Sequence, residues 1–195
     1  VIMVGEIRDS DTAEIAVQSS LTGHMVFSTL HTNNAAGVIP RLIDLGVNPK
    51  IMVSALSLSI AQRLVRKLCK FCKKENAPTK EEAGVIKIVL DSMKNEGKDF
   101  SKYNIKTDKS FKIFSPVGCD KCNNIGYKGR IGIFEAIKTD EAIEKIMPEN
   151  PSEHEIKKVA HSQGILSMRQ DGVVKILNGI TSITEVQSVV DLLEE

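Results

Sequence analysis

Val1-Ile2-Met3-Val4-Gly5-Glu6, four apolar residues that end abruptly in a glycine and a carboxylate, begin the stretch that decides the fold. A second apolar run, 25–30, lies between His24 and His31, and helix-compatible sequence joins the two runs. Two short runs of β-formers connected by a helix predict a βαβ unit and an α/β fold. Ligands collect at the carboxyl ends of such strands, which is where Glu6 and His31 fall. An acid and a base at one sheet edge indicate an active site.

The composition excludes several classes of protein. The net charge of +1 argues against a strongly electrostatic nucleic-acid binder, and the absence of Trp with only 4% aromatic residues argues against stacking on bases. The sequence has no run of about 18 apolar residues, so we expect no membrane span. Because an apolar strand starts at the first residue, we expect the chain to be a piece of a longer protein.

Periodicity and breakers divide the chain into three segments, which we expect to be separate domains: 1–68, 69–129 and 130–195. Pro40 lies inside a predicted helix, which either bends there or starts near it. Residues 98–109 are polar and predict a loop. The predicted strands are 1–4, 24–30, 60–68, 111–114 and 130–137; the predicted helices are 12–21, 35–45, 49–58, 81–95, 140–147, 152–163, 165–177 and 183–193.

Four cysteines form two Cys-x-x-Cys pairs, Cys69 with Cys72 and Cys119 with Cys122. Each pair puts two thiolates on one side of a tight turn, and two such turns supply the tetrahedral sulfur shell of a structural Zn²⁺ site. The segment between the pairs is longer than in ordinary zinc ribbons. A redox pair and free thiols are the alternatives. If zinc is bound, its role is to cross-link the two turns, because four protein ligands leave no open position.

The acid and the histidines also have ordinary explanations. Glu6 is as readily explained as a surface residue paired with Arg8 as by a catalytic role. His24 can be explained as a loop residue, and His31 as a hydrogen-bonded histidine of the core. Their placement in one βαβ unit favours function. In nucleotide hydrolases a carboxylate after an apolar strand holds Mg²⁺ through water or orients the attacking water. A nearby imidazole can sense the terminal phosphate.

The chain closely resembles the secretion ATPases, the hexameric motors of type II secretion and type IV pilus assembly. The resemblance covers most of the chain outside Thr79–Lys112 and includes both cysteine pairs. The other segments that carry it are 1–9 (the Walker B box), 22–33 (the histidine box), Pro40-Arg41-Leu42-Ile43-Asp44-Leu45-Gly46, Ala61-Gln62-Arg63-Leu64-Val65-Arg66-Lys67-Leu68-Cys69, Gly126-Tyr127-Lys128-Gly129-Arg130-Ile131-Gly132-Ile133-Phe134-Glu135 and Ser167-Met168-Arg169-Gln170-Asp171-Gly172.

The resemblance implies the carboxyl-terminal part of a RecA-like P-loop ATPase domain, an inserted tetracysteine zinc subdomain and a carboxyl-terminal helical region. Glu6 matches the glutamate that activates or positions the hydrolytic water. His31 and His24 match the histidine box, with His31 expected nearest the γ-phosphate. Gly5 and Arg8 are weaker candidates for nucleotide binding. The cysteines match the zinc motif that similar pilus-retraction motors lack.

Two departures from the family pattern are mild: Asp11 replaces a frequent Glu, and Asn34 replaces a frequent Asp. The larger departure is that no Gly-x-x-x-x-Gly-Lys-[Ser/Thr] loop occurs in these residues. That loop provides most of the nucleotide binding in P-loop proteins. We therefore expect this chain alone neither to bind ATP tightly nor to hydrolyse it.

The leading hypothesis is thus a fragment of an ATP-driven motor that uses ATP, Mg²⁺ and Zn²⁺. The resemblance implies a hexamer, an inner-membrane platform protein and other secretion or pilus machinery as partners, and a cytoplasmic location at the inner face of the bacterial membrane. The alternatives are a zinc-cross-linked interaction module without catalysis, a nucleic-acid-binding zinc domain, and a retraction-type ATPase.

Overall fold

The computed structural model describes residues 1–105 and 111–193 and has a mixed α/β architecture. The chain forms two compact units. Unit 1 comprises Val1–Ala61 and Glu135–Ile165, and unit 2 comprises Gln62–Phe134 and Leu166–Glu195. The two units are defined by which residues contact one another, whereas the three predicted segments were defined by changes in composition. The predicted domain boundaries at 68 and 129 therefore stay a prediction.

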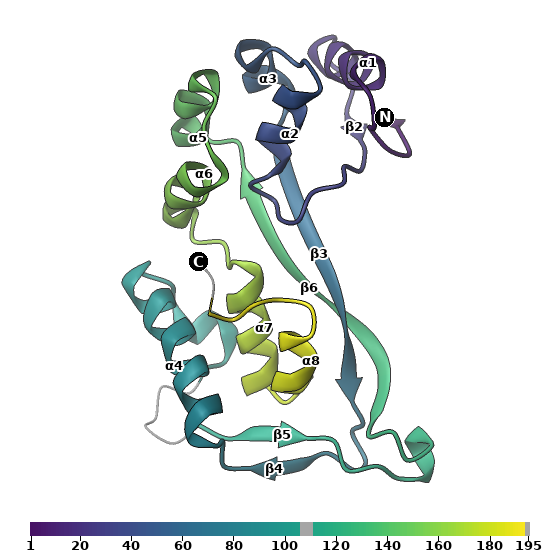
Figure 1. Ribbon diagram of the computed structural model, residues 1–195, viewed down its shortest axis with the longest axis vertical. Helices are drawn as coiled ribbons and strands as arrows, with labels where there is room; N and C mark the ends of the chain where they lie inside the picture. The colour runs from purple at the N-terminus through teal and green to yellow at the C-terminus, as the bar shows by residue number, and fades with distance from the viewer. Residues whose placement is uncertain (106–110, 194–195) are drawn as a thin grey trace. The chain divides into compact units, whose positions relative to one another are not determined.

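Unit 1 begins with the predicted βαβ motif, drawn in purple in Figure 1. Strand β1 (Ile2–Met3), helix α1 (Ser10–Leu21) and strand β2 (Val26–Phe27) follow one another, and the strands pair in parallel, Ile2 with Val26 and Met3 with Phe27. The Asp9 side chain accepts a 2.8 Å hydrogen bond from Thr12 N at the start of α1, as an N-cap should.

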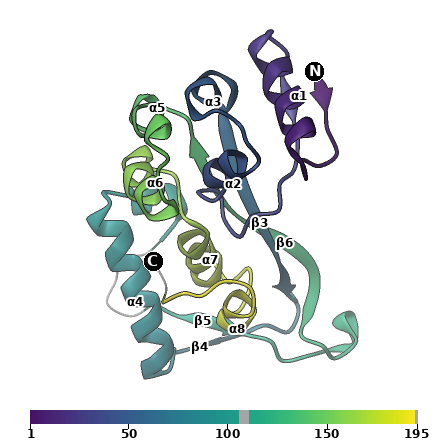
Figure 2. The ribbon, with the colours of Figure 1, turned by 45° about the horizontal axis from the view of Figure 1, so that its top comes forward.

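The rest of unit 1 is helical: α2 (Val38–Asp44), α3 (Pro49–Ala55), α5 (Glu141–Ile146), the 3₁₀ turn η3 (Met147–Glu149), α6 (Glu153–Ala160) and η4 (His161–Gln163). Figure 2 shows α2 and α3 after the βαβ motif, and α5 and α6 after strand β6 (Tyr127–Lys138). Pro40 lies in the first turn of α2, where its missing N–H costs no helical hydrogen bond, so the helix starts near the proline. The core is formed by buried side chains of Ile39, Met52, Ile143, Met147 and Ile156.

Two long strands, β3 (Leu58–Leu68) and β6 (Tyr127–Lys138), pair in a second sheet, and the boundary between the units falls inside both. Both were predicted as strands. β3 carries buried residues at alternate positions along much of its length, but its apolar residues do not follow this alternation strictly, since Leu58, Ile60 and Leu64 are exposed.

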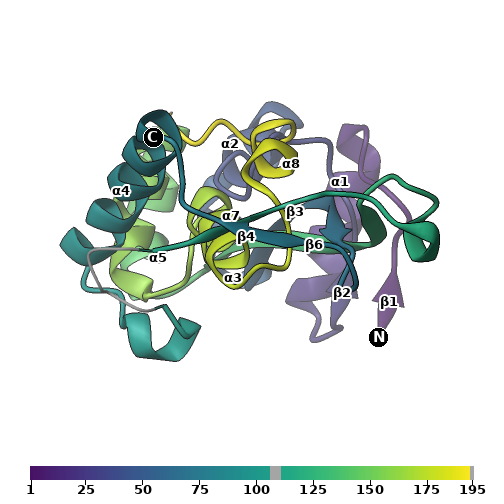
Figure 3. The same ribbon diagram turned by 90° about the horizontal axis from the view of Figure 1, so that it is seen from below.

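Unit 2 contains a third sheet of two short antiparallel strands, β4 (Lys74–Asn76) and β5 (Ile113–Ser115), which lie side by side in Figure 3. Its remaining elements are α4 (Lys80–Asn95), η1 (Phe100–Tyr103), η2 (Asp120–Cys122), α7 (Met168–Leu177) and α8 (Ile183–Gln187). Helix α4 packs on α7 around Met93 and Val174. Thr79 and Glu82 form a capping box that starts α4.

Several predicted bounds differ from the structure, and three of the differences have identifiable reasons. Helix α7 starts at Met168 and not near 165, because the Ser167 hydroxyl accepts from Gln170 N and caps it there. Helix α8 ends at Gln187, before the β-branched pair Val189 and Val190. The predicted loop 98–109 contains η1, and its residues 106–109 lie outside the described residues. In the described part of the chain, no helix has the length and apolar character that a bilayer crossing requires.

Candidate functional site

The segments that follow β1 and β2 stay side by side beyond the strands. Ile7 N donates to Thr29 O at 2.9 Å, and Thr29 Oγ1 donates to Gly5 O at 2.8 Å. Because the strands are parallel, their carboxyl ends meet at one edge. The structure therefore places Glu6 and His31 together at that edge, as the sequence predicts.

Glu6 is the centre of this cluster. Its Oε2 accepts from Arg8 Nε, and its Oε1 contacts His31 Nε2. The Glu6 side chain is only 20% exposed, whereas Arg8 and His31 are 74% and 84% exposed. Each carboxylate oxygen keeps lone pairs beyond these contacts. A carboxylate oriented in this way can accept a proton from a water molecule or bind a hydrated Mg²⁺ ion.

His24 lies elsewhere. It precedes β2 and therefore falls at the opposite end of that strand from His31. Its Nδ1 is 3.2 Å from Thr22 Oγ1 and 3.3 Å from Ser19 O, at the carboxyl end of α1. The structure thus joins Glu6, Arg8 and His31 but leaves His24 outside the cluster. A catalytic role for His24 stays a prediction.

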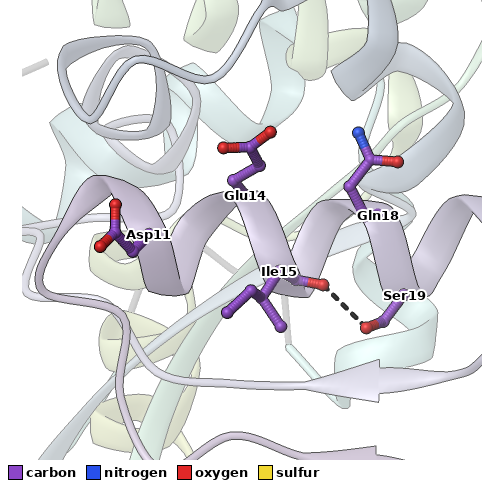
Figure 4. Close-up of a pocket in the computed structure, with 5 residues that line it drawn as sticks. All are labelled: Asp11, Glu14, Ile15, Gln18 and Ser19. Carbon is purple, nitrogen blue, oxygen red and sulfur yellow. Dashed lines mark hydrogen bonds between the residues drawn. The ribbon is translucent and has the colours of Figure 1, made fainter.

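Neither Gly5 nor a shallow pocket on α1 contributes a contact to the cluster of Glu6, Arg8 and His31. A Cβ placed on Gly5 would have no atom within 4 Å, so no steric contact of the described residues requires glycine there. A shallow pocket on α1 is lined by Asp11, Glu14, Ile15, Gln18 and Ser19, all from that one helix (Figure 4). It includes neither Glu6 nor His31, and the cluster of interest is therefore at the sheet edge.

Sequence reasoning missed two carboxylates, Glu135 and Glu153, that bind the segment after His31. Ala35 N donates to Glu135 Oε1 at 2.7 Å, and Asn34 Nδ2 donates to Glu153 Oε2 at 2.9 Å. These partners are a hundred or more residues apart in the chain. Glu135 closes one of the family-like segments, but nothing in the local pattern assigns it a partner.

The four cysteines converge in unit 2, as predicted. Their sulfurs all lie within 4.8 Å of one another, with Cys69–Cys119 at 3.9 Å and both Cys72–Cys122 and Cys119–Cys122 at 3.8 Å. A tetrahedral site with Zn–S bonds of about 2.3 Å has sulfur–sulfur edges of about 3.8 Å. The cluster therefore fits a tetrahedral metal ion and not a disulfide, whose sulfurs are about 2.0 Å apart.

Backbone N–H groups point at the sulfurs. Cys122 Sγ accepts from Cys119 N at 3.3 Å and Gly126 N at 3.2 Å, and Cys72 Sγ accepts from Gly118 N at 3.3 Å. Burial raises the pKa of Cys122, but the hydrogen bonds from the two N–H groups and from the thiols of Cys119 and Cys72 together outweigh burial and bring that pKa to about 7. Donors of this kind orient thiolates and stabilise their charge around a metal.

One face of the β1–β2 sheet is not covered by any of the residues that the structure describes. Val1, Met3, Met25 and Phe27 alternate with half-buried residues and are 54–92% exposed. Parallel sheets are normally covered on both faces. Four large apolar side chains on one face of this sheet therefore indicate a surface that another structural layer covers.

Comparison with solved structures defines the class of fold. The pilus retraction motor PilT with bound ADP matches with a TM-score of 0.58 at 19% identity, over 97% of this chain and 39% of that protein's chain. The Legionella pneumophila ATPase DotB matches with a TM-score of 0.56 at 20% identity, over 96% of this chain and 38% of that protein's chain. At this level of identity the likeness concerns the fold alone. The chain has the fold found in the corresponding part of these ATPases.

The family follows from the sequence. The family model described as "Type II/IV secretion system protein" matches residues 1–188, and this chain belongs to that family. It is 46% identical over 189 residues to the type IV pilus assembly ATPase PilB of Pseudomonas aeruginosa, over 97% of this chain. It is 42% identical over 190 residues to the type II secretion system ATPase E of Vibrio cholerae, also over 97%. The chain spans 31% and 34% of the lengths of these two relatives.

Proposed function

We propose that this chain is the carboxyl-terminal part of a hexameric ATP-hydrolysing motor that powers type II secretion or type IV pilus assembly. The observation that carries the proposal is the contact of Glu6 with His31 at the carboxyl edge of two parallel strands, in a chain of the secretion family. The fold and the named relatives support the same assignment.

In the proposed reaction Glu6 orients the water that attacks the terminal phosphate and takes up its proton. Its half-buried position and its two nitrogen partners support this role. Exposed His31 would stabilise charge on the phosphate, with Arg8 beside it. Gly5 would allow close approach of the nucleotide. Bound ATP and Mg²⁺ would supply the phosphoryl group and the charge neutralisation that phosphoryl transfer needs.

The groups that bind the nucleotide phosphates would come from outside these residues. The sequence contains no Gly-x-x-x-x-Gly-Lys-[Ser/Thr] loop, and the apolar face at Met3 and Phe27 is uncovered. We propose that further layers of the same ATPase domain cover this face and provide the phosphate-binding loop. The chain by itself would then be inactive.

The cysteine cluster is proposed to hold one structural Zn²⁺. Cys69, Cys72, Cys119 and Cys122 would each give one thiolate, and the sulfur spacing supports the fit. With all four positions filled by protein, the ion would link the turn after β3 to the turn before β6 and take no part in hydrolysis.

Partners and location follow the same proposal. The motor would assemble as a hexamer, engage an inner-membrane platform protein and other machinery, and act in the cytoplasm at the inner face of the bacterial membrane. A retraction-type ATPase is the second candidate, supported by the PilT fold. The cysteine cluster and the assembly and secretion relatives at 38–46% identity favour the first.

A hybrid protein tests the proposal. This chain replaces the matched residues of the Pseudomonas aeruginosa relative, and ATP turnover of the hybrid is compared with that of the chain alone. We expect ATP hydrolysis by the hybrid and none above background by the chain. A folded hybrid that binds ATP without hydrolysing it would contradict the assignment, as would turnover by the chain alone.

A further inference from the structure

The segment that follows His31, residues 32–37, is held by two carboxylates from the other sequence segment of unit 1. We call residues 32–37 the histidine loop. Ala35 N donates to Glu135 Oε1 at 2.7 Å, and Glu135 belongs to β6. Ala35 is 1% exposed, so water does not substitute freely as its partner. A buried N–H group without an acceptor is costly, and Glu135 is therefore important to this backbone conformation.

A second set of hydrogen bonds that fixes the histidine loop involves Asn34. Its Oδ1 accepts from Gly37 N at 2.8 Å, and its Nδ2 donates to Glu153 Oε2 at 2.9 Å, at the start of α6. The loop lies close against this carboxylate, because a Cβ on Gly37 would come within 2.9 Å of Glu153 Oε1. Thr32 Oγ1 also donates to Asn34 O at 3.0 Å and closes the loop on itself.

The His31 ring depends on this loop for its position. The side chain is 84% exposed and contacts the Glu6 carboxylate, so little packing restrains it. The backbone that carries it leads directly into the histidine loop. A shift of that loop would therefore move the ring relative to Glu6.

We propose that Glu135, with Glu153 acting through Asn34, is a positioning residue that sets His31 against Glu6. Neither carboxylate need touch the nucleotide. Both carboxylates come from Glu135–Ile165, whereas Glu6 and His31 come from Val1–Ala61. The segment Glu135–Ile165 therefore acts on the candidate site through the histidine loop. The catalytic consequence rests on the proposed function, but the positioning itself does not.

The first test uses the 195-residue chain and NMR. Glu135→Ala should speed hydrogen exchange at Ala35 N by about tenfold or more, since the buried acceptor is lost. It should also move the His31 ring resonances in the same direction as Glu6→Gln does. Glu135→Gln keeps an acceptor oxygen and should restore both signals. Glu144→Ala, an exposed carboxylate on α5, is the matched control and should change neither.

The second test uses the hybrid. Glu135→Ala should lower kcat for ATP about tenfold with KM changed less than twofold, and Glu135→Gln should recover most of kcat. If Glu135→Ala fails to fold, Glu153→Ala replaces it. Glu153 is exposed, and its substitution removes only the hydrogen bond from Asn34 Nδ2.

The outcomes separate the two proposals. An unchanged His31 ring in a folded Glu135→Ala or Glu153→Ala chain overturns the positioning role, whatever the hybrid does. A hybrid that never hydrolyses ATP overturns the proposed function, while the His31 resonances of the chain still decide the positioning role. Equal effects from Glu144→Ala would also overturn it.

Discussion

Removing the metal from the cysteine cluster should lower the stability of the chain by a measurable amount. Three of the sulfur–sulfur distances are 3.8–3.9 Å, close to the edges of a tetrahedral zinc site, and all four sulfurs lie within 4.8 Å of one another. A ligand that binds only the folded state contributes about 4 kcal/mol when its free concentration is a thousand times its dissociation constant. For a chain of this size about 1 kcal/mol corresponds to roughly 2–4 °C, so chelation should lower the Tm by about 8–16 °C.

The assay combines metal content with thermal unfolding. Protein purified under reducing conditions should contain one zinc per chain, and Co²⁺ substitution should give the visible spectrum of a tetrahedral thiolate site. Cys72→Ser should lose the metal and the added stability together. Lys70→Ser changes the same turn without removing a ligand and should keep both. A metal-free wild-type chain that is fully folded and insensitive to chelators would refute the zinc cross-link.

Two further predictions concern a salt bridge and the uncovered sheet face. Glu185→Gln should lower the free energy of unfolding at neutral pH by about 1 kcal/mol, because the carboxylate is paired with Arg66 in a partly solvent-screened contact. The hydrogen bond from Arg66 holds the pKa of Glu185 below its ordinary value, so this stabilisation is complete above about pH 4.3 and is lost as the pH falls through the lowered pKa. Urea titrations at neutral and strongly acidic pH measure it, and a difference that persists in acid contradicts the assignment. The double substitution Met3→Thr and Phe27→Ser should reduce self-association and binding of a hydrophobic dye while changing stability by less than about 1 kcal/mol, since both side chains are exposed. Sedimentation velocity and dye fluorescence test this. A strictly monomeric wild-type chain that binds no dye would contradict the inference that another layer covers this face of the sheet.

The sequence predicted the βαβ motif and the edge at which Glu6 and His31 meet, because both depend on local signals. Apolar runs, the Asp9 cap and the parallel strand order are enough to bring two strand ends together. The cysteine cluster was also predictable, since each Cys-x-x-Cys turn is local and a metal site needs both.

Other features depend on contacts between distant residues. Strand β4 has three residues, which is too short for a periodic signal, and only its pairing with β5 defines it, whereas β5 overlaps the strand predicted at 111–114. The bond from Ala35 to Glu135 spans a hundred residues, and a lone glutamate in a strand carries no sign of its partner. His24 shows a different limit, because its role was expected from the family resemblance alone, although its place before β2 puts it at the opposite end of that strand from His31.

The most direct test of the account is ATP turnover and ATP binding by the hybrid with Glu6→Gln. If Glu6 takes the proton from the attacking water, kcat should fall by about 10²–10⁴-fold. The dissociation constant for ATP should change little, because the proposed phosphate-binding loop lies outside these residues. Glu14→Gln, an exposed carboxylate on α1, is the matched control and should keep wild-type turnover. Turnover that survives Glu6→Gln at the wild-type rate would show that Glu6 is not the catalytic carboxylate.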